Sequence, residues 1–278
     1  MNEGNRPDET LEREYSPSSR AGGTADPHLA RYRHQSAAIA AGWGSRLEHL
    51  PGGTLLVAGS PTLVFVHGGY WQALSAAASL VPAPPAVDAG WGYAAVEYTL
   101  APAAGITTMV AECTEALRLV AERSGGPLVV AGHSAGAHLV AMATLVAAPP
   151  VEISRVVLVS GVYDLRPIVH TTVNQPLGLA VDEAIALSPV LRGVRQGAAA
   201  PEVVVAWGQL DTAAFAAQSV RYAEVLAGAG VSVETIECAG LHHFDIIDGL
   251  AEPRTPLGRL TRARTRTSAP HPPGQAAP

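Results

Sequence analysis

The segment Gly132-His133-Ser134-Ala135-Gly136 has the residue types and the spacing of a turn that presents a nucleophilic serine. It follows an apolar run at 127–131 and opens an alanine-rich stretch at 134–147, so we expect a strand, a sharp turn and a helix. Such a turn needs small residues two positions from the serine on each side, and two glycines supply them. The alternative is an ordinary glycine-rich turn before a helix. The flanking strand and helix favour Ser134 as the nucleophile of an acyl-transfer reaction.

A second glycine-rich segment, His67-Gly68-Gly69-Tyr70-Trp71, directly follows the apolar run at 62–66. An enzyme that attacks a carbonyl carbon needs backbone N–H groups aimed at the oxygen that becomes negatively charged. A loop in this position supplies such groups together with the residue that follows the nucleophile, and glycine lets the backbone approach closely. We therefore expect an oxyanion hole built from the backbone N–H group of Gly69 or Tyr70 together with that of Ala135.

A serine hydroxyl is a weak nucleophile and needs a neighbouring imidazole that is itself oriented by a carboxylate. In folds that present a nucleophilic serine on such a turn between a strand and a helix, the chain order is serine, then acid, then histidine. Asp211 follows the apolar run at 202–207, whereas Asp164 follows the run at 155–160; we favour Asp211 as the acid, with Asp164 as its competitor. His242 and His243 both follow the last apolar run, and we favour His243 as the base.

Aromatic side chains near these motifs are candidates for contacts with the substrate. Tyr70 and Trp71 are placed to narrow the acyl side of the site and to offer an aromatic face to a ring, and Tyr163 is a third candidate. The alternative for Trp71 is packing in the core. No cluster in the sequence has the spacing of a metal site, and no phosphate-binding loop appears, so we expect neither a metal nor a cofactor.

Short β-branched runs alternate with alanine-rich stretches along the part of the chain that carries these motifs. Strands are expected at 54–57, 62–66, 93–98, 127–131, 155–160, 202–207 and 231–236. Helices are expected at 73–81, 105–123, 134–147, 212–229 and 244–251. This alternation predicts an α/β fold with a doubly wound, mostly parallel sheet and helices on both faces. Residues 161–200 interrupt the alternation, and we expect them to form a small lid-like excursion and part of a pocket wall.

The two ends of the chain differ in composition from its middle. Residues 1–27 are rich in Glu, Arg, Ser, Pro and Gly, and residues 253–278 contain prolines and arginines without apolar periodicity. We expect both ends to be disordered, with one α/β domain over residues 28–252.

The overall composition argues against several classes of protein. Hydrophobic residues make up 48% of the 278 residues and charged residues 15%, which excludes a chain that is disordered throughout. The net charge of −6 argues against nucleic acid as a partner and leaves a small molecule as the expected substrate. We see no apolar signal segment and no uninterrupted apolar span, so we expect no membrane association. With two cysteines and no disulfide framework, we expect a cytoplasmic protein.

Taken together, the serine turn, the loop from His67 to Trp71 and the order of serine, acid and histidine resemble the α/β-hydrolase superfamily. More narrowly, the loop sequence HGGYW is similar to the HGGxW motif of the kynurenine formamidases, or arylformamidases, whereas lipase-type esterases usually read HGGG. The resemblance covers roughly residues 62–250. Further matching segments are Tyr98 to Pro102, Gly132 to Leu139, Ser160 to Pro167, Leu187 to Pro189 and His243 to Ile247.

The resemblance implies a serine hydrolase with Ser134 as nucleophile, Asp211 as acid and His243 as base. It also implies backbone donors for the oxyanion around Gly68, Gly69 and Ala135. It implies cleavage of the formamide of N-formyl-L-kynurenine, or of a similar N-formyl arylamine, in tryptophan catabolism. The products would be formate and the free amine, formed through a formyl-serine intermediate. An arginine, with Arg166 as one candidate, is expected to meet the substrate carboxylate, and the resemblance suggests a homodimer. The alternatives are a small-acyl carboxylesterase, a related formamidase of secondary metabolism and a non-catalytic ligand-binding hydrolase fold.

Overall fold

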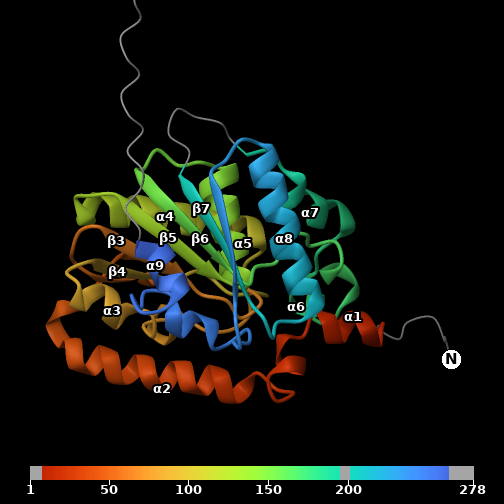
Figure 1. The fold of residues 1–278 in the computed structure, drawn as a ribbon, viewed down its shortest axis with the longest axis horizontal. Coiled ribbons are helices and arrows are strands. Elements are labelled where there is room, and N and C mark those ends of the chain that lie inside the picture. Colours follow the sequence, from red (N-terminus) through yellow and green to blue (C-terminus); the bar gives the residue numbers. More distant parts are fainter. Residues whose placement is uncertain (1–7, 195–200, 263–278) are drawn as a thin grey trace, which may run out of the picture.

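A mixed sheet of eight strands forms the centre of the computed structural model, which describes residues 8–194 and 201–262 (Figure 1). The order of the strands in the sheet is β1-β2-β4-β3-β5-β6-β7-β8. Strands β1 and β2 run antiparallel to their neighbours, whereas β3 to β8 are parallel to one another. The strands are β1 Glu48–His49, β2 Leu55–Val57, β3 Thr62–Val66, β4 Gly92–Val96, β5 Leu128–His133, β6 Ile153–Val159, β7 Glu202–Gly208 and β8 Val233–Cys238.

Helices pack on both faces of this sheet. They are α1 Glu9–Glu14, α2 Asp26–Trp43, α3 Ala83–Asp88, α4 Ile106–Ser124, α5 Ala135–Val140, α6 Asn174–Leu177, α7 Val181–Ala186, α8 Ala213–Gly228 and α9 Pro256–Arg262. Helix α4 shows why a helix forms here, because its buried residues Met109, Cys113, Leu117 and Val120 recur at steps of three and four. The arrangement agrees with the α/β fold that the alternation of the sequence predicts.

The core consists of two apolar clusters, one on each face of the sheet. Side chains of a strand alternate between its faces, so neighbouring residues join different clusters. Val64 and Val130 are register partners and pack toward α4, α5 and α8. Phe65 and Ala131, the next partners along these strands, pack toward α2, α3 and α9. Strands β3, β4 and β5 are buried along their whole length, and their carboxyl ends support the functional loops.

The expectation of a helix over 73–81 is wrong, because this stretch forms a loop after β3. The stretch contains a short 3₁₀ turn at Ala76–Ala78, and α3 begins only at Ala83. Tyr70, Trp71 and Leu74 have positive φ angles, so the chain bends sharply just before the 3₁₀ turn. The expected helix over 244–251 is likewise reduced to a 3₁₀ turn at Ile246–Gly249.

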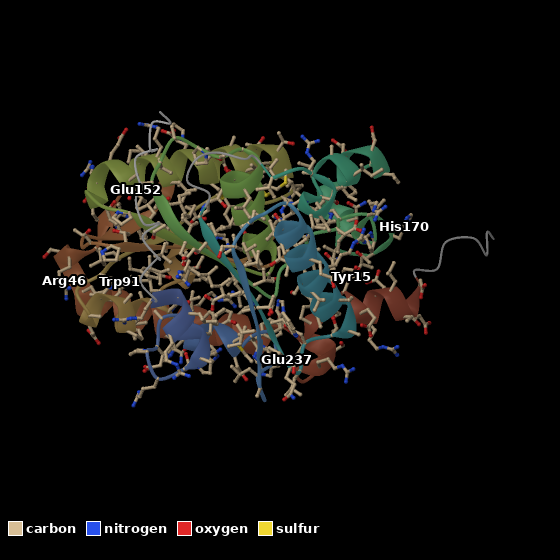
Figure 2. The ribbon with its side chains drawn as sticks, turned by 45° about the horizontal axis from the view of Figure 1, so that its top comes forward. Tyr15, Arg46, Trp91, Glu152, His170 and Glu237 are labelled. Atoms are coloured by element: carbon tan, nitrogen blue, oxygen red, sulfur yellow. The ribbon has the colours of Figure 1, made fainter. Side chains whose placement is uncertain are left out.

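Residues 8–25, which we call the N-terminal strap, have a defined structure, contrary to the expectation of disorder over 1–27. Asp8 caps α1 by accepting hydrogen bonds from the N–H groups of Thr10 and Leu11. Tyr15 is buried, and its ring contacts Phe215 of α8, beside which Figure 2 shows it. Composition does not reveal such a segment, because a few well-placed contacts hold it.

The C-terminal expectation of disorder over 253–278 is also wrong in part. Helix α9 buries Leu257 in the core, and Arg155 of β6 donates a hydrogen bond to the carbonyl oxygen of Leu260. Residues 1–7 and 263–278 lie outside the described residues, so the expectation for them stays a prediction.

The excursion between β6 and β7 consists of α6, α7 and two 3₁₀ turns, at Ile168–His170 and Pro189–Leu191. Helix α6 lies close to α1 of the strap (Figure 1), and Thr172 of the excursion donates hydrogen bonds to Glu12 of the strap. Residues 195–200 of the excursion lie outside the described residues. None of the helices in the described ranges has the length and apolar character that crossing a membrane requires.

Candidate active site

Ser134 occupies the sharp turn between β5 and α5, where the sequence predicts a nucleophile. Its φ of 56° and ψ of −123° lie in a region that residues with a side chain rarely adopt. The turn requires the glycine on each side, because a Cβ on Gly132 would lie 2.4 Å from the carbonyl oxygen of Gly136. A Cβ on Gly136 would lie 2.1 Å from the carbonyl oxygen of Val66, at the end of β3. The close packing of α5 against β3 and β5 thus holds Ser134 at the carboxyl ends of these strands.

His243 is held by Asp211, which lies in the loop after β7. Nδ1 of His243 is 3.1 Å from Oδ1 of Asp211, and both side chains are buried. Phe215 of α8 packs its ring against His243 with the centroids 4.8 Å apart. The bond to Asp211 assigns the proton to Nδ1, which leaves Nε2 as an acceptor. Ser134 and His243 line the same cavity, so Nε2 is the nitrogen that could act as a general base there.

The Asp211 carboxylate receives two further hydrogen bonds. The hydroxyl of Ser160 donates to Oδ2 at 2.6 Å, and the N–H of Gly208 donates to the same oxygen at 2.9 Å. Burial alone would raise the pKa of Asp211, but His243, Ser160 and Gly208 together hold that pKa below its ordinary value. Asp211 therefore stays ionised and keeps the imidazole oriented. The sequence reasoning missed Ser160, which stands directly after β6 with a φ of 46°.

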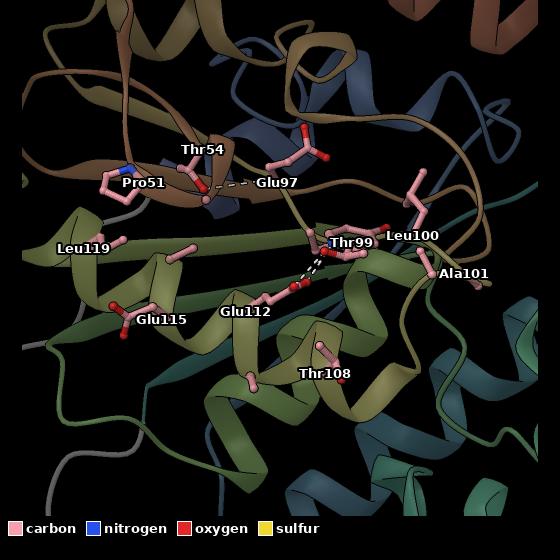
Figure 3. A pocket seen from close by; sticks show the side chains of 15 residues that line it. Pro51, Thr54, Glu97, Thr99, Leu100, Ala101, Thr108, Glu112, Glu115 and Leu119 are labelled. Atoms are coloured by element: carbon pink, nitrogen blue, oxygen red, sulfur yellow. Dashed lines mark hydrogen bonds between the residues drawn. The ribbon is translucent and has the colours of Figure 1, made fainter.

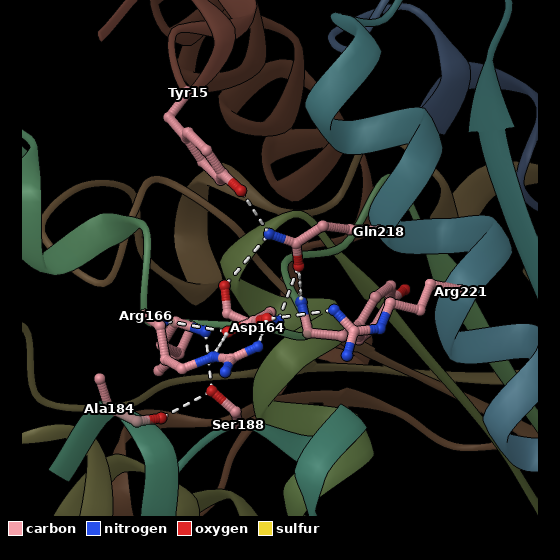
Figure 4. A network of polar contacts seen from close by, with 9 residues as sticks. Tyr15, Asp164, Arg166, Ala184, Ser188, Gln218 and Arg221 are labelled. Atoms are coloured by element: carbon pink, nitrogen blue, oxygen red, sulfur yellow. Dashed lines mark hydrogen bonds and ion pairs between the residues drawn. The ribbon is translucent and has the colours of Figure 1, made fainter. Parts of the chain in front are cut away.

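Asp164, the competing acid, has a different set of partners (Figure 4). Arg166 donates to both of its carboxylate oxygens, at 2.9 and 2.7 Å, and Arg221 lies 3.5 Å away. Gln218 of α8 accepts from the N–H of Asp164 at 2.7 Å and donates to the hydroxyl of Tyr15 at 2.8 Å. This network fastens the strap and the start of the excursion to α8. The structure thus brings Asp211, and not Asp164, to His243.

His242, the alternative base, points to the carboxylate of Asp245, with its Nε2 atom 2.9 Å from Oδ2. Its Nδ1 atom accepts a hydrogen bond from the N–H of Phe244. Both ring nitrogens are therefore engaged within the same loop, so His243 is the histidine that the structure pairs with Asp211.

The expected oxyanion loop lies directly beside Ser134. A Cβ on Gly68 would lie 2.9 Å from the Cβ of Ser134, and a Cβ on Gly69 would lie 2.4 Å from the carbonyl oxygen of Ala73. Within the described part of the chain, no carbonyl accepts from the N–H groups of Gly69, Tyr70 or Ala135. These three N–H groups are free to bind an oxyanion.

Tyr98, which sequence reasoning did not single out as a site residue, braces this loop. Its hydroxyl lies 3.0 Å from the carbonyl oxygen of His67 and 3.1 Å from that of Gly68. Its ring stacks on the imidazole of His67 with the centroids 4.3 Å apart. Burial lowers the pKa of His67 to about 4, so this imidazole is neutral at pH 7 and acts as packing. The available signal was a tyrosine two residues after the end of β4.

A cavity of about 330 Å³ opens beside Ser134. Its walls include His133, His243 and Phe244, together with Gly69 to Leu74 without Trp71, and Thr172 and Val173 of the excursion. The strap and α2 close the other side through Glu12, Tyr15 to Ser18, Ala25, Leu29 and Tyr32. The volume lies at the lower end of the range for small-molecule sites. The excursion therefore contributes a pocket wall, and the strap contributes another that the sequence did not predict.

Of the three aromatic residues expected to contact the substrate, Trp71 and Tyr163 do not line the cavity of Ser134. Tyr70 lines the cavity, and its hydroxyl donates to the carbonyl oxygen of Tyr15 at 2.5 Å. Trp71 is fully buried and packs edge-on against His138, so it belongs to the core, as the alternative held. Tyr163 is also buried and stacks on Tyr222. Tyr163 borders a separate cavity with Asp164, so it does not line the cavity of Ser134.

A second cavity, of about 910 Å³, lies between α4 and the loops at 51–54 and 97–103 (Figure 3). Glu112 on its wall accepts hydrogen bonds from the N–H and the hydroxyl of Thr99. Its lining contains neither serine nor histidine, so it lacks the groups for acyl transfer. Across the described ranges, no group of three or more His, Cys, Asp or Glu side chains is placed to hold a metal ion.

Comparison with known proteins shows the family of this chain. A family model described as the α/β-hydrolase fold matches residues 63–246. Kynurenine formamidase from Danio rerio is 35% identical over 208 residues, which are 72% of this chain and 71% of that protein. Kynurenine formamidase from Drosophila melanogaster is 30% identical over 217 residues, which are 73% of this chain and 72% of that protein.

Solved structures share the same architecture. A protein from a Silicibacter species, provisionally assigned as a thioesterase, superposes with a TM-score of 0.81 at 29% identity, over 91% of this chain and 99% of that chain. An esterase from Pyrobaculum calidifontis superposes with a TM-score of 0.66 at 19% identity, over 91% of this chain and 94% of that chain. The second likeness shows the fold alone.

Proposed function

The chain belongs to the α/β-hydrolase family and is a hydrolase related to the kynurenine formamidases, and from this premise we propose that it cleaves the formamide of N-formyl arylamines. N-formyl-L-kynurenine is the first substrate to test. The observation that carries the proposal is a cavity that holds Ser134, His243 and the free N–H groups of the HGGYW loop, with Asp211 bonded to His243. The relatives supply the chemical class of the substrate.

The proposed reaction begins with attack of the Ser134 hydroxyl oxygen on the formyl carbon. Nε2 of His243 takes the hydroxyl proton, and the N–H groups of Gly69, Tyr70 and Ala135 stabilise the negative oxygen. His243 then gives the proton to the aryl nitrogen as the carbon–nitrogen bond breaks, which releases the amine and leaves formyl-Ser134. A water molecule, deprotonated by His243, then attacks the ester carbon. The imidazolium returns this proton to the Ser134 oxygen as the bond between that oxygen and the formyl carbon breaks, which releases formate and restores the serine. Asp211 stays ionised throughout and stabilises the imidazolium.

A small acyl group suits the space beside Ser134. The oxyanion loop packs so closely on the turn that Gly68 has no room for a Cβ next to Ser134. Formyl is the smallest acyl group, and the larger leaving amine has the cavity between the strap and the excursion. The ring of Tyr70 in the cavity wall offers a face for an aryl group.

The test compares the purified protein with its Ser134→Ala variant on N-formylkynurenine and on p-nitrophenyl acetate. We expect formamide turnover, followed by the release of formate and of the aryl amine, to fall at least about 10³-fold in the variant. Ser124→Ala, at the end of α4 and away from the cavity, is the matched control and keeps full activity. Ser134-dependent cleavage of the ester alone would instead identify a small-acyl carboxylesterase. Absence of any Ser134-dependent turnover would point to a ligand-binding role.

A further inference from the structure

Glu12 of the strap lines the cavity that contains Ser134 and is held there in one orientation. Its carboxylate oxygens accept hydrogen bonds from the N–H of Thr172 at 2.5 Å and from the Thr172 hydroxyl at 2.9 Å. Thr172 belongs to the excursion, so the carboxylate is fixed between two walls of the cavity. A carboxylate has about four lone-pair positions, and these bonds use two of them. The remaining positions are available to donors on a bound molecule.

No cationic side chain of the described residues neutralises Glu12. None of the ion pairs between described residues involves it. Of the two histidines in the lining, His133 has its pKa lowered to about 3, mainly by burial, and is therefore neutral at pH 7. His243 is held by Asp211. Among the described residues, the cavity that contains Ser134 therefore presents one uncompensated negative charge, that of Glu12.

A negatively charged group on a ligand has no cationic partner among the described residues of this lining. The described residues that line the cavity include no arginine, and the sequence contains no lysine. Arg166, the candidate for a substrate carboxylate, is bonded to Asp164. The expectation that Arg166 meets a carboxylate is therefore wrong for this cavity.

From this arrangement we propose that Glu12 is a specificity-determining residue that binds a primary ammonium group on the leaving-amine part of the substrate. The inference rests on the proposed function and names its substrate class: N-formyl arylamines whose side chain carries an aliphatic amine. N-formylkynurenine satisfies this rule with its α-ammonium group, whereas its carboxylate gains no cationic partner among the described residues. An ammonium donates charge-assisted hydrogen bonds to a carboxylate, and such bonds are stronger than neutral ones.

The experiment compares three ortho-formamidophenyl ketones as substrates. The first is the ethyl ketone, which has no charge; the second carries a terminal primary amine on the same chain; the third is N-formylkynurenine, which has both amine and carboxylate. We expect kcat/KM for the amine to exceed that for the neutral ketone about tenfold, since Glu12 is half-exposed and solvent weakens the pair. Adding the carboxylate should give no further gain. A carboxylate-bearing substrate that is preferred over the amine tenfold or more would overturn the proposal.

Two variants separate the charge of Glu12 from its structural contact with Thr172. Glu12→Gln keeps an oxygen that accepts from Thr172 but removes the charge, so the preference for the amine should fall below about twofold. Thr172→Val removes the hydroxyl contact and keeps the charge, so the preference should remain. An amine preference that is unchanged in Glu12→Gln would show that the carboxylate only joins the strap to the excursion.

Binding to the inactive Ser134→Ala protein tests the same inference without catalysis. Calorimetry would compare the deformylated amino ketone with the deformylated ethyl ketone, in this background with and without Glu12→Gln. We expect the amino ketone to bind about tenfold more tightly, and only when Glu12 is present. Equal affinities would refute the role of Glu12. If no formamide is cleaved but this difference appears, the proposed function fails and the ammonium site stands.

Discussion

Asp211 orients His243 only as well as its own carboxylate is held. One oxygen faces Nδ1 of His243, and the other accepts from the Ser160 hydroxyl and from the N–H of Gly208. These bonds favour the charged carboxylate and offset the cost of its burial. Ser160 holds its hydroxyl there from a backbone with φ of 46°, which is unfavourable for a residue with a side chain. The strained position indicates that the hydroxyl has a positioning role.

Removal of the Ser160 hydroxyl should lower kcat more than it changes KM. In Ser160→Ala we expect kcat to fall about tenfold, because Asp211 loses one of its donors, whereas Asp211→Asn should lose about 10⁴-fold. Ser160→Gly also removes the hydroxyl, and it relieves the strain of the positive φ as well. If the hydroxyl is what positions Asp211, both Ser160 variants should lose the same fraction of kcat, whatever their difference in stability. Steady-state kinetics and urea unfolding on each variant make the comparison. If both Ser160 variants keep full kcat, the hydroxyl is not needed to position Asp211.

His138 joins helix α5, which follows the serine turn, to the excursion. Its Nε2 atom is 2.8 Å from the carbonyl oxygen of Leu187, and the ring is buried against Trp71. Burial lowers the pKa of His138 to about 4, so the folded protein holds it neutral. The unfolded chain has the ordinary pKa of about 6.5 and takes up a proton earlier as the pH falls. His138 therefore destabilises the folded state progressively as the pH falls from about 6.5 toward 4.

The His138→Gln variant should weaken this dependence on pH. Glutamine keeps a donor for the Leu187 carbonyl but cannot be protonated, so the slope of unfolding free energy against pH should decrease by up to about 1.4 kcal/mol per pH unit. The slope is measured by urea unfolding between about pH 7 and pH 4.5, where the two proteins share all other histidines. Equal slopes would mean that His138 does not titrate differently in the folded and unfolded chains.

The strap closes one side of the cavity that contains Ser134, from outside the central sheet. It is held at several distant points: Tyr15 bonds Gln218, Thr212 bonds the carbonyl oxygen of Glu14, and Tyr70 bonds the carbonyl oxygen of Tyr15. The last contact reaches the loop that supplies the proposed oxyanion donors. The strap thus connects one wall of the cavity to that loop.

Deletion of residues 1–25 should leave the sheet folded but impair the site. We expect kcat/KM for aryl formamides to fall at least about tenfold, because the cavity loses one wall and Tyr70 loses its acceptor. Cleavage of p-nitrophenyl acetate, whose leaving group needs less enclosure, should fall less, and the melting temperature should drop by a few degrees. Circular dichroism verifies that the shortened chain is folded. Unchanged formamide kinetics in that chain would contradict a role for the strap.

Local patterns in the sequence determined the central sheet and the serine turn. The apolar runs that become β3, β5, β6 and β7 are near-continuous, as in strands buried on both faces. Gly132 is required by a local contact, because a Cβ there would meet the carbonyl oxygen of Gly136, whereas Gly136 is required by its contact with Val66 of β3. The order of serine, acid and histidine placed the candidates after the carboxyl ends of β5, β7 and β8. These features depend on short stretches of chain, so the sequence alone predicts them.

Tertiary structure decided which side chains meet across long separations. The pairing of His243 with Asp211, the donation of Ser160 to that carboxylate, and the contact between Glu12 and Thr172 each depend on packing between distant elements. Trp71 entered the core instead of the cavity because the loop turns at positive φ and points the indole toward His138. The sequence did not predict the ordered strap either, because contacts with distant elements hold it. Its composition is polar, and its order comes from partners that lie up to about two hundred residues away, such as Gln218.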